Sequence, residues 1–246
     1  AFLLPAGGLG AATRGLRGVR APPAVRSSFT PAPWTAGRST RAARPAAAVV
    51  MATSTYKVVV LGGGNAAGYV AKSLVEASPD TSLCIVGREE VLPYERPALS
   101  KAFLFAEPPA RLPGFHTSVG GGGARQDAAW YADKGVDVKL STEVTGVDVA
   151  SKTLTTASGD TVVAEEALII ATGAAPIALT KTPGWDLDGV YTLRENAEGL
   201  RLYDALQAAK GEPVVVVGGG YIGMEVAAAA ATVGCKVKMV YPDKHM

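Results

Sequence analysis

The chain has 246 residues, 48% of them apolar and 19% charged, which is an ordinary globular composition with room for one large or two modest domains. No apolar run approaches the roughly 20 residues that a helix needs to span a bilayer. The net charge of +2 hides an asymmetry, because residues 1–56 hold seven arginines and no acidic residue, while the other 17 basic residues face 22 acidic ones. The main body is therefore acidic, and we expect neither nucleic acid nor a membrane among its partners.

Residues 1–55 are predicted to be a transit peptide or disordered leader. They are rich in Arg, Ala, Ser, Thr and Pro and lack acidic side chains, which fits organelle targeting better than a nucleic-acid-binding arm. A low-complexity tail without an addressing role is the alternative. The Ser, Thr and Pro content and the stretch 46–52 favour the chloroplast over the mitochondrion, and an internal start at Met51 would give a cytosolic form.

From residue 56 onward, strand and helix patterns alternate. The apolar runs 56–61 and 82–87 predict buried parallel strands on either side of a helix over 65–77. Residues 93–123 are so rich in Pro and Gly that we expect a ligand-covering loop rather than core. The further elements expected in chain order are a helix (127–134), a strand (136–140), a hairpin joined through residues 158–160 (143–149 and 161–166), an apolar strand (167–171), a crossing segment (174–193), a helix (195–209) and a second βαβ unit (214–240).

Two glycine-rich turns of one design lie 156 positions apart in the sequence. The first follows the apolar strand 57–61 and has the G-x-G-x-x-A form, with Gly62, Gly64 and Ala67. The second follows the strand 214–217 and matches G-x-G-x-x-G at Gly218, Gly220 and Gly223. Each turn joins a β-branched strand to an Ala-rich helix, the context in which backbone N–H groups and a helix N-terminus approach a pyrophosphate. Two such turns in one chain predict two bound dinucleotides.

The expected fold is therefore α/β, with two Rossmann-like three-layer dinucleotide-binding domains. We place the leader at 1–55, the first domain at 56–173 and the second at 174–246. The chain starts with Ala1 and stops at Met246, directly after the second strand of the second unit, whose open edge would need further strands. We therefore expect a fragment of a longer protein, with the second domain truncated.

Acidic residues follow the second strand of each unit. A carboxylate about 20 residues past the fingerprint accepts hydrogen bonds from a ribose diol, and Asp243 and Glu89 lie at this distance from Gly223 and Gly68. A carboxylate at Asp243 would repel a 2′-phosphate and favour NADH over NADPH. The alternative for either acid is a solvated loop charge.

The cysteines and histidines indicate neither a thiol relay nor a metal. Cys84 and Cys235 are the only cysteines, lack C-x-x-C spacing and lie in apolar strand patterns, so we expect buried thiols. His116 and His245 lack further metal ligands nearby, and we expect both to be non-catalytic.

Over residues 57–246 the sequence resembles the monodehydroascorbate reductases. The motifs that occur in that family's order are the two fingerprints, Pro-Tyr-Glu-Arg-Pro-Ala-Leu-Ser-Lys at 93–101, Ala-Arg-Leu-Pro-Gly-Phe-His at 110–116 and Ala-Thr-Gly at 171–173. The Ala-Thr-Gly motif and the paired fingerprints mark the broad FAD and NAD(P)H reductase superfamily, and 94–101 is shared with ferredoxin-type reductases. The stretch 111–116 followed by Trp130-Tyr131 narrows the match.

The resemblance implies an FAD enzyme that uses NADH, with NADPH possible, to reduce a small-molecule substrate, the monodehydroascorbate radical, to ascorbate. The substrate site and a second FAD segment would lie beyond residue 246. A ferredoxin or rubredoxin reductase is the alternative within the same chemistry, and a flavin-binding redox sensor is the alternative from another class.

The resemblance also implies roles for individual residues. The residues that would contact FAD are Gly62, Gly63, Gly64, Asn65 and Ala66 at the pyrophosphate, Glu89 at the adenosine ribose, Val144 at the adenine, and Arg96, Lys101, Thr172, Gly173, Arg194 and Glu195. Those that would hold NAD are Gly218, Gly219, Gly220, Tyr221, Ile222, Gly223, Met224, Glu225 and Asp243. Read without the resemblance, Arg194 and Glu195 are charges at a helix N-terminus.

Lys101, Glu225 and Tyr221 are the residues implied to serve catalysis. Lys101 and Glu225 would form a charge-assisted pair beside the flavin N5, and a separation beyond roughly 6 Å would count against it. Without the resemblance, each is an ordinary surface charge. Tyr221 would stand where the nicotinamide enters, or alternatively pack in the core.

Overall fold

A computed structural model describes residues 2–3, 51–105 and 125–242. Its elements are β1 (Phe2–Leu3), β2 (Thr53–Leu61), α1 (Asn65–Ala77), β3 (Leu83–Val86), the 3-10 helix η1 (Arg96–Ser100), α2 (Ala102–Phe105), α3 (Ala128–Asp133), β4 (Val136–Lys139), β5 (Val144–Asp148), β6 (Thr153–Thr156), β7 (Thr161–Ile170), β8 (Val190–Tyr191), α4 (Asn196–Ala208), β9 (Pro213–Val217), α5 (Tyr221–Val233) and β10 (Lys236–Val240). Most of the predicted leader, the motif at 110–116, His116, Asp243 and His245 lie outside the described residues.

The first unit contains a six-stranded sheet in the order β4-β3-β2-β7-β6-β5. Strands β2, β3 and β4 are parallel, and β7 pairs parallel to β2 on its other side. Antiparallel pairing then joins β7 to β6 and β6 to β5. The β2–α1–β3 segment is thus the predicted βαβ unit, with β2 in the middle of the sheet.

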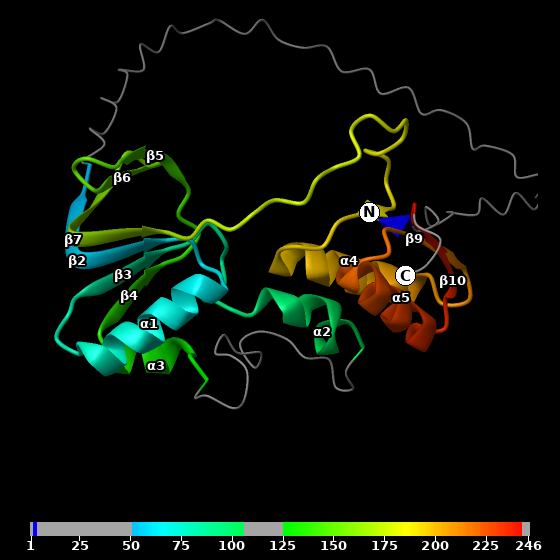
Figure 1. Cartoon of the computed structure of the whole chain (residues 1–246), viewed down its shortest axis with the longest axis horizontal. Helices are drawn as coiled ribbons and strands as arrows, with labels where there is room; N and C mark the ends of the chain where they lie inside the picture. Colours follow the sequence, from blue (N-terminus) through cyan, green and yellow to red (C-terminus); the bar gives the residue numbers. More distant parts are fainter. Residues whose placement is uncertain (1, 4–50, 106–124, 243–246) are drawn as a thin grey trace, which may run out of the picture. The chain divides into compact units, whose positions relative to one another are not determined.

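The sheet of the first unit separates two apolar layers. Side chains alternate along a strand, so Val58 and Val60 of β2 pack in one cluster with α1 and α3, while Val59 and Leu61 pack in another with β6 and β7. Figure 1 shows α1 and α3 on one side of the sheet and the β5–β6 hairpin on the other. The first domain was expected to have three layers, and here the layers are helices, parallel strands and the β5–β6 hairpin.

Two strand predictions in this unit were wrong. The segment between residues 149 and 161 contains β6, so the predicted single hairpin is two hairpins. The predicted strands 161–166 and 167–171 are one continuous strand, β7. Its first half alternates between buried and partly buried residues, whereas its second half is an apolar run. The change from one pattern to the other was therefore read as the end of one strand and the start of another.

The second unit has a four-stranded sheet in the order β10-β9-β1-β8. Strands β9 and β10 are parallel, and α5 connects them along the chain, as the predicted second βαβ unit requires. Strand β1 pairs antiparallel with β9 and β8, so residues 2–3 belong to this sheet. Strand β2 likewise begins at Thr53, before the predicted end of the leader.

The prediction that residues 93–123 form only a covering loop was wrong for its described part. Residues 96–105 form η1 and α2, and Tyr94, Leu99, Phe103 and Leu104 are buried in one core with α4, α5 and β9. Pro97 stands in the first turn of η1, where its missing N–H costs nothing, so the proline that suggested a loop begins a helix.

Cys84 and Cys235 are both buried, as predicted. Burial raises the pKa of the Cys84 thiol to about 12, and Asp137 adds to the rise. The described residues contain no helix long and apolar enough to cross a membrane. Within the same residues, no three His, Cys, Asp or Glu side chains gather as metal ligands would. The fold is α/β with two Rossmann-like units.

Candidate functional site

The first glycine turn joins β2 to α1 in a conformation that requires glycine at its first position. Gly62 has a φ of +121°, and a Cβ there would lie 2.2 Å from the carbonyl oxygen of Ala171. The Gly62 N–H donates to Val86 O at 2.8 Å, which ties the turn to β3. Gly64 is the N-cap of α1 and has no side chain to cap it, so the N–H groups of the first turn can face an anion.

The second glycine turn repeats this construction between β9 and α5. Gly218 has a φ of +116° and donates its N–H to Val240 O at 2.8 Å. A Cβ on Gly223 would lie 2.2 Å from Gly218 O, so the first turn of α5 packs directly on the strand end. A Cβ on the N-cap Gly220 would meet nothing within 4 Å. That open space in front of a 13-residue helix fits a phosphate group.

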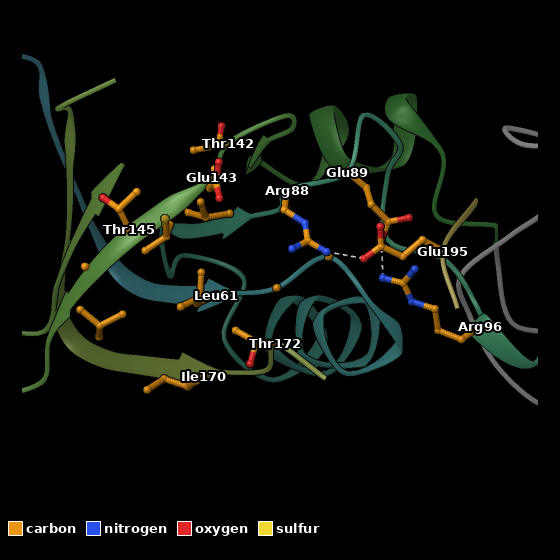
Figure 2. A pocket seen from close by; sticks show the side chains of 16 residues that line it. Leu61, Arg88, Glu89, Arg96, Thr142, Glu143, Thr145, Ile170, Thr172 and Glu195 are labelled. Carbon is orange, nitrogen blue, oxygen red and sulfur yellow. Dashed lines mark hydrogen bonds and ion pairs between the residues drawn. The ribbon is translucent and has the colours of Figure 1, made fainter. Parts of the chain in front are cut away.

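A cavity of about 430 Å³ opens beside the first turn (Figure 2). It lies at the carboxyl ends of β2, β3 and β7, the edge where α/β sheets bind ligands. Its lining residues include Gly62, Gly63, Arg88, Glu89, Arg96, Thr142, Val144, Thr145, Thr172 and Glu195. The sequence analysis missed Thr142 and Thr145, which follow β4 and begin β5, because no motif marks that connection.

Glu89 and Arg96 form an ion pair in the wall of this cavity, with side chains only 14% and 16% exposed. The hydroxyl of Tyr94 donates to Glu89 Oε2 at 2.8 Å, and the Asn196 N–H approaches the same oxygen at 3.3 Å. Burial would raise the pKa of Glu89, but the hydrogen bonds from Arg96 and Tyr94 outweigh it and lower that pKa. Both carboxylate oxygens therefore have protein partners, and the role of Glu89 at a ribose stays a prediction.

Arg88 and Glu195 form a second ion pair across the same cavity, at 2.5 Å (Figure 2). Glu195 is also the N-cap of α4, where it forms a capping box with Glu198. Arg194 lies beside the Ala-Thr-Gly turn, because a Cβ on Gly173 would be 3.0 Å from its guanidinium. These contacts join β3, the end of β7 and α4 around the cavity.

A further cavity of about 560 Å³ lies between η1 and the start of α5. It is lined by Asn65, Arg96, Pro97, Ser100, Lys101, Leu193, Arg194, Tyr221, Ile222 and Glu225. Arg96 also lines the first cavity, so the two share a wall. Glycines of the first turn line the first cavity, whereas Tyr221, Ile222 and Glu225 of α5 line the second.

The expected contact between Lys101 and Glu225 is present. Lys101 Nζ lies 2.7 Å from Glu225 Oε1, well inside the predicted limit. Hydrogen bonds from Lys101 and then from Ser100 lower the pKa of Glu225. Tyr221 is 83% exposed, which excludes the alternative that it packs in the core. Ser100 was missed by the sequence analysis, although it directly precedes Lys101.

The remaining predicted residues lie near the two glycine turns and the two cavities. Asn65 accepts a hydrogen bond from the Arg96 N–H at 3.0 Å, and Ala66 is exposed at the start of α1. Ile222 and Met224 are exposed on the first turn of α5. The roles of all these residues toward a cofactor stay predictions. The Lys101–Glu225 ion pair connects the segment after η1 with α5.

Comparison with known proteins agrees with this geometry. A monodehydroascorbate reductase of Solanum lycopersicum is 46% identical over 196 residues, which are 78% of this chain and 45% of that protein. A chloroplastic/mitochondrial monodehydroascorbate reductase of Arabidopsis thaliana is 46% identical over 208 residues, 83% of this chain and 42% of the relative. The crystal structure of a ferredoxin reductase from Rhodopseudomonas palustris is 30% identical, with a TM-score of 0.60 over 74% of this chain and 42% of that one.

The chain spans less than half the length of each of these relatives. A family model described as pyridine nucleotide-disulphide oxidoreductase matches residues 56–246, which include both glycine turns and both cavities. The chain therefore belongs to the pyridine nucleotide-disulphide oxidoreductase family.

Proposed function

We propose that the protein is an FAD-dependent reductase that uses NAD(P)H to reduce the monodehydroascorbate radical to ascorbate. The observation that carries the proposal is the placement of Lys101 and Glu225, which meet in a cavity lined by residues from η1 and from the start of α5. Bound there, FAD would accept a hydride from NADH and pass electrons singly to the radical. The 46% identity to enzymes named monodehydroascorbate reductase supports this substrate.

The first unit, residues 56–173, holds FAD. The turn from Gly62 to Ala66 binds the pyrophosphate through its N–H groups, and α1 carries no acidic side chain in its first turn to repel it. Val144, which lines the first cavity, would pack against the adenine. The Glu89–Arg96 pair keeps the Arg96 guanidinium in the wall that both cavities share.

The second unit, residues 174–246, holds NADH. The turn from Gly218 to Gly223 and the N-terminus of α5 bind its pyrophosphate, and Asp243 accepts from its adenosine ribose and disfavours NADPH. Lys101 and Glu225, which form an ion pair, would place two opposite charges where the two rings meet. Tyr221 stands exposed at that place, where the nicotinamide enters.

We infer a chloroplast protein whose arginine-rich segment ahead of β2 acts as a transit peptide and whose partner is a small molecule rather than nucleic acid. The arginine-rich, acid-free composition of that segment supports the inference. The names of similar proteins include chloroplastic/mitochondrial, cytosolic and peroxisomal forms, so the compartment rests on the leader alone.

A ferredoxin or rubredoxin reductase is the second candidate, because the ferredoxin reductase structure shares the fold at 30% identity. Stopped-flow mixing of NADH with the purified intact protein, including the segments expected beyond residue 246, separates the possibilities. We expect the flavin absorbance to bleach within seconds and to return when ascorbate oxidase generates the radical from added ascorbate, but not when an oxidised ferredoxin is supplied. Re-oxidation by the ferredoxin alone would favour the second candidate. A flavin that stays oxidised, or a colourless protein, would refute the reductase proposal.

A further inference from the structure

Ser100 is a buried neighbour of the Lys101–Glu225 pair and contacts the carboxylate oxygen that Lys101 does not. It is the last residue of η1 and is only 3% exposed. Its Oγ lies 2.5 Å from Glu225 Oε2 and 3.2 Å from the carbonyl oxygen of Pro97. A serine hydroxyl has one hydrogen to donate, and the charged carboxylate is the stronger acceptor. The hydroxyl of Ser100 therefore donates to Glu225.

Lys101 is much less restrained than Ser100. Its side chain is 53% exposed, compared with 29% for Glu225, and within the described residues it also donates to the Pro97 carbonyl at 3.4 Å. An exposed ion pair on a flexible four-carbon stem contributes little stability and does not by itself fix a geometry. The attraction between the two charges therefore leaves the orientation of the carboxylate open. The buried hydroxyl of Ser100, which is carried on a short side chain, restricts that orientation.

We propose that Ser100 is the positioning residue of this pair. It anchors one oxygen of Glu225, so that the other oxygen faces Lys101 and directs the ammonium into the cavity. Ser100 ends η1 and Lys101 directly follows it, whereas Glu225 comes from α5, so the two bonds link these two helices. The assignment rests on the proposed function, since positioning serves catalysis only if the rings of FAD and NADH meet in this cavity.

Removal of the hydroxyl should release the carboxylate without disturbing the fold. In Ser100→Ala, Glu225 loses one of the two hydrogen bonds that it accepts from described residues and keeps the one from Lys101, so the pKa of Glu225 should rise toward its ordinary value. Ser100→Thr retains a hydroxyl and should restore the low pKa. The other charged groups that line the cavity are Arg96, Lys101 and Arg194, and none of them is changed in these variants.

The first test is an NMR titration of the Glu225 side-chain carboxyl carbon in the wild type and in these two variants. Ser158→Ala is the matched control, because Ser158 also donates to a carboxylate, that of Asp160 at 2.8 Å, in the turn before β7. We expect the pKa of Glu225 to rise in Ser100→Ala and to stay unchanged in Ser158→Ala. An unchanged pKa in Ser100→Ala, or an equal change in the control, would overturn the proposal.

The second test is the rate at which NADH reduces the bound flavin. Loss of one hydrogen bond to a charged group should slow this step about tenfold in Ser100→Ala, with unchanged NADH affinity and melting temperature. Ser100→Thr should recover most of the rate. A full rate in Ser100→Ala, or a slow rate with a lowered melting temperature, would contradict the positioning role. If the protein reduces no flavin, the proposed function fails, and the titration still decides whether Ser100 holds Glu225.

Discussion

Replacement of Gly62 by alanine should impose two separate costs on the first dinucleotide turn. The backbone at Gly62 has a φ of +121°, which a residue with a Cβ rarely adopts, and the added Cβ would lie 2.2 Å from Ala171 O. Substitutions at two glycines of the second turn allow the cost of the backbone conformation to be measured separately from the cost of the steric overlap. Gly218 has nearly the same φ, +116°, but a Cβ there meets nothing within 4 Å, and Gly220 has neither the unusual φ nor a neighbour.

The geometry gives an order of magnitude for each substitution. A strained φ costs about 1–3 kcal/mol and should affect Gly62→Ala and Gly218→Ala alike. The overlap with Ala171 involves backbone, which cannot rotate away, and should add about 1–3 kcal/mol to Gly62→Ala alone. Gly220→Ala loses a preferred N-cap residue but makes the unfolded chain less flexible, so its net effect should stay within about 1 kcal/mol.

Urea unfolding followed by tryptophan fluorescence measures these differences, because Trp130 lies on α3 beside the first sheet. Stability should fall most in Gly62→Ala, less in Gly218→Ala and least in Gly220→Ala. Gly220→Ala should nevertheless weaken NADH binding, since its methyl group enters the space proposed for the pyrophosphate. Equal stability of Gly62→Ala and Gly218→Ala would refute the steric argument. Unchanged NADH affinity in Gly220→Ala would refute the proposal that the pyrophosphate binds at Gly220.

Three further predictions concern single side chains. Glu89→Gln should cost about 3 kcal/mol at neutral pH, because it leaves the guanidinium of Arg96 without its counter-charge. The lowered pKa of Glu89 means that its contribution is fully present above the ordinary value near 4.5 and is lost as the pH falls through the lower folded value, so unfolding curves should converge for wild type and variant only in acid. Tyr221→Ala should change the free energy of unfolding by no more than about 0.5 kcal/mol, since the side chain is exposed, yet slow flavin reduction by NADH; a large loss of stability with a normal rate would show that the ring is structural. Cys84, buried and with a pKa raised to about 12, should react with a maleimide only after unfolding, and rapid labelling of the native protein, located by mass spectrometry, would contradict its burial.

Local features of the sequence were sufficient to predict the two βαβ units. The helix predicted over 65–77 matches α1, and the turn before it was recognised because its glycines have a conformational role that other residues cannot fill. The same reasoning predicted the second unit, in which Gly223 packs on Gly218. In both cases the signal is contained within about ten neighbouring residues.

The predictions failed where burial depends on residues far away in the sequence. Residues 96–105 were read as a loop because proline and glycine surround them, yet Leu99 and Phe103 pack on α4, where Gly199 leaves room for the Phe103 ring. A Cβ on Gly199 would lie only 2.9 Å from that ring. Neither residue's own neighbourhood in the sequence contains this information.

The sequence was more informative about which residues belong to the candidate site than about the contacts between them. The Lys101–Glu225 contact was expected only through the family resemblance, because 124 residues separate the two positions. The partners of Glu89 were not expected, since the orientation of its carboxylate is decided by Tyr94 and Arg96, which follow in an irregular segment. Asp243 lies outside the described residues, so its part in NADH preference stays a prediction.

The pairing of β2 with β7 has a consequence for how the protein is made. Thr53 lies opposite Thr161, so the central strand of the sheet meets one of its two neighbours only after 108 further residues have been synthesised. Until β7 leaves the ribosome, one edge of an apolar strand stays open, and such edges invite pairing with other chains. Contacts this distant in sequence also slow folding. Chaperone occupancy on the nascent chain should therefore be highest while residues 80–170 are being translated, and should decline once β7 closes the sheet.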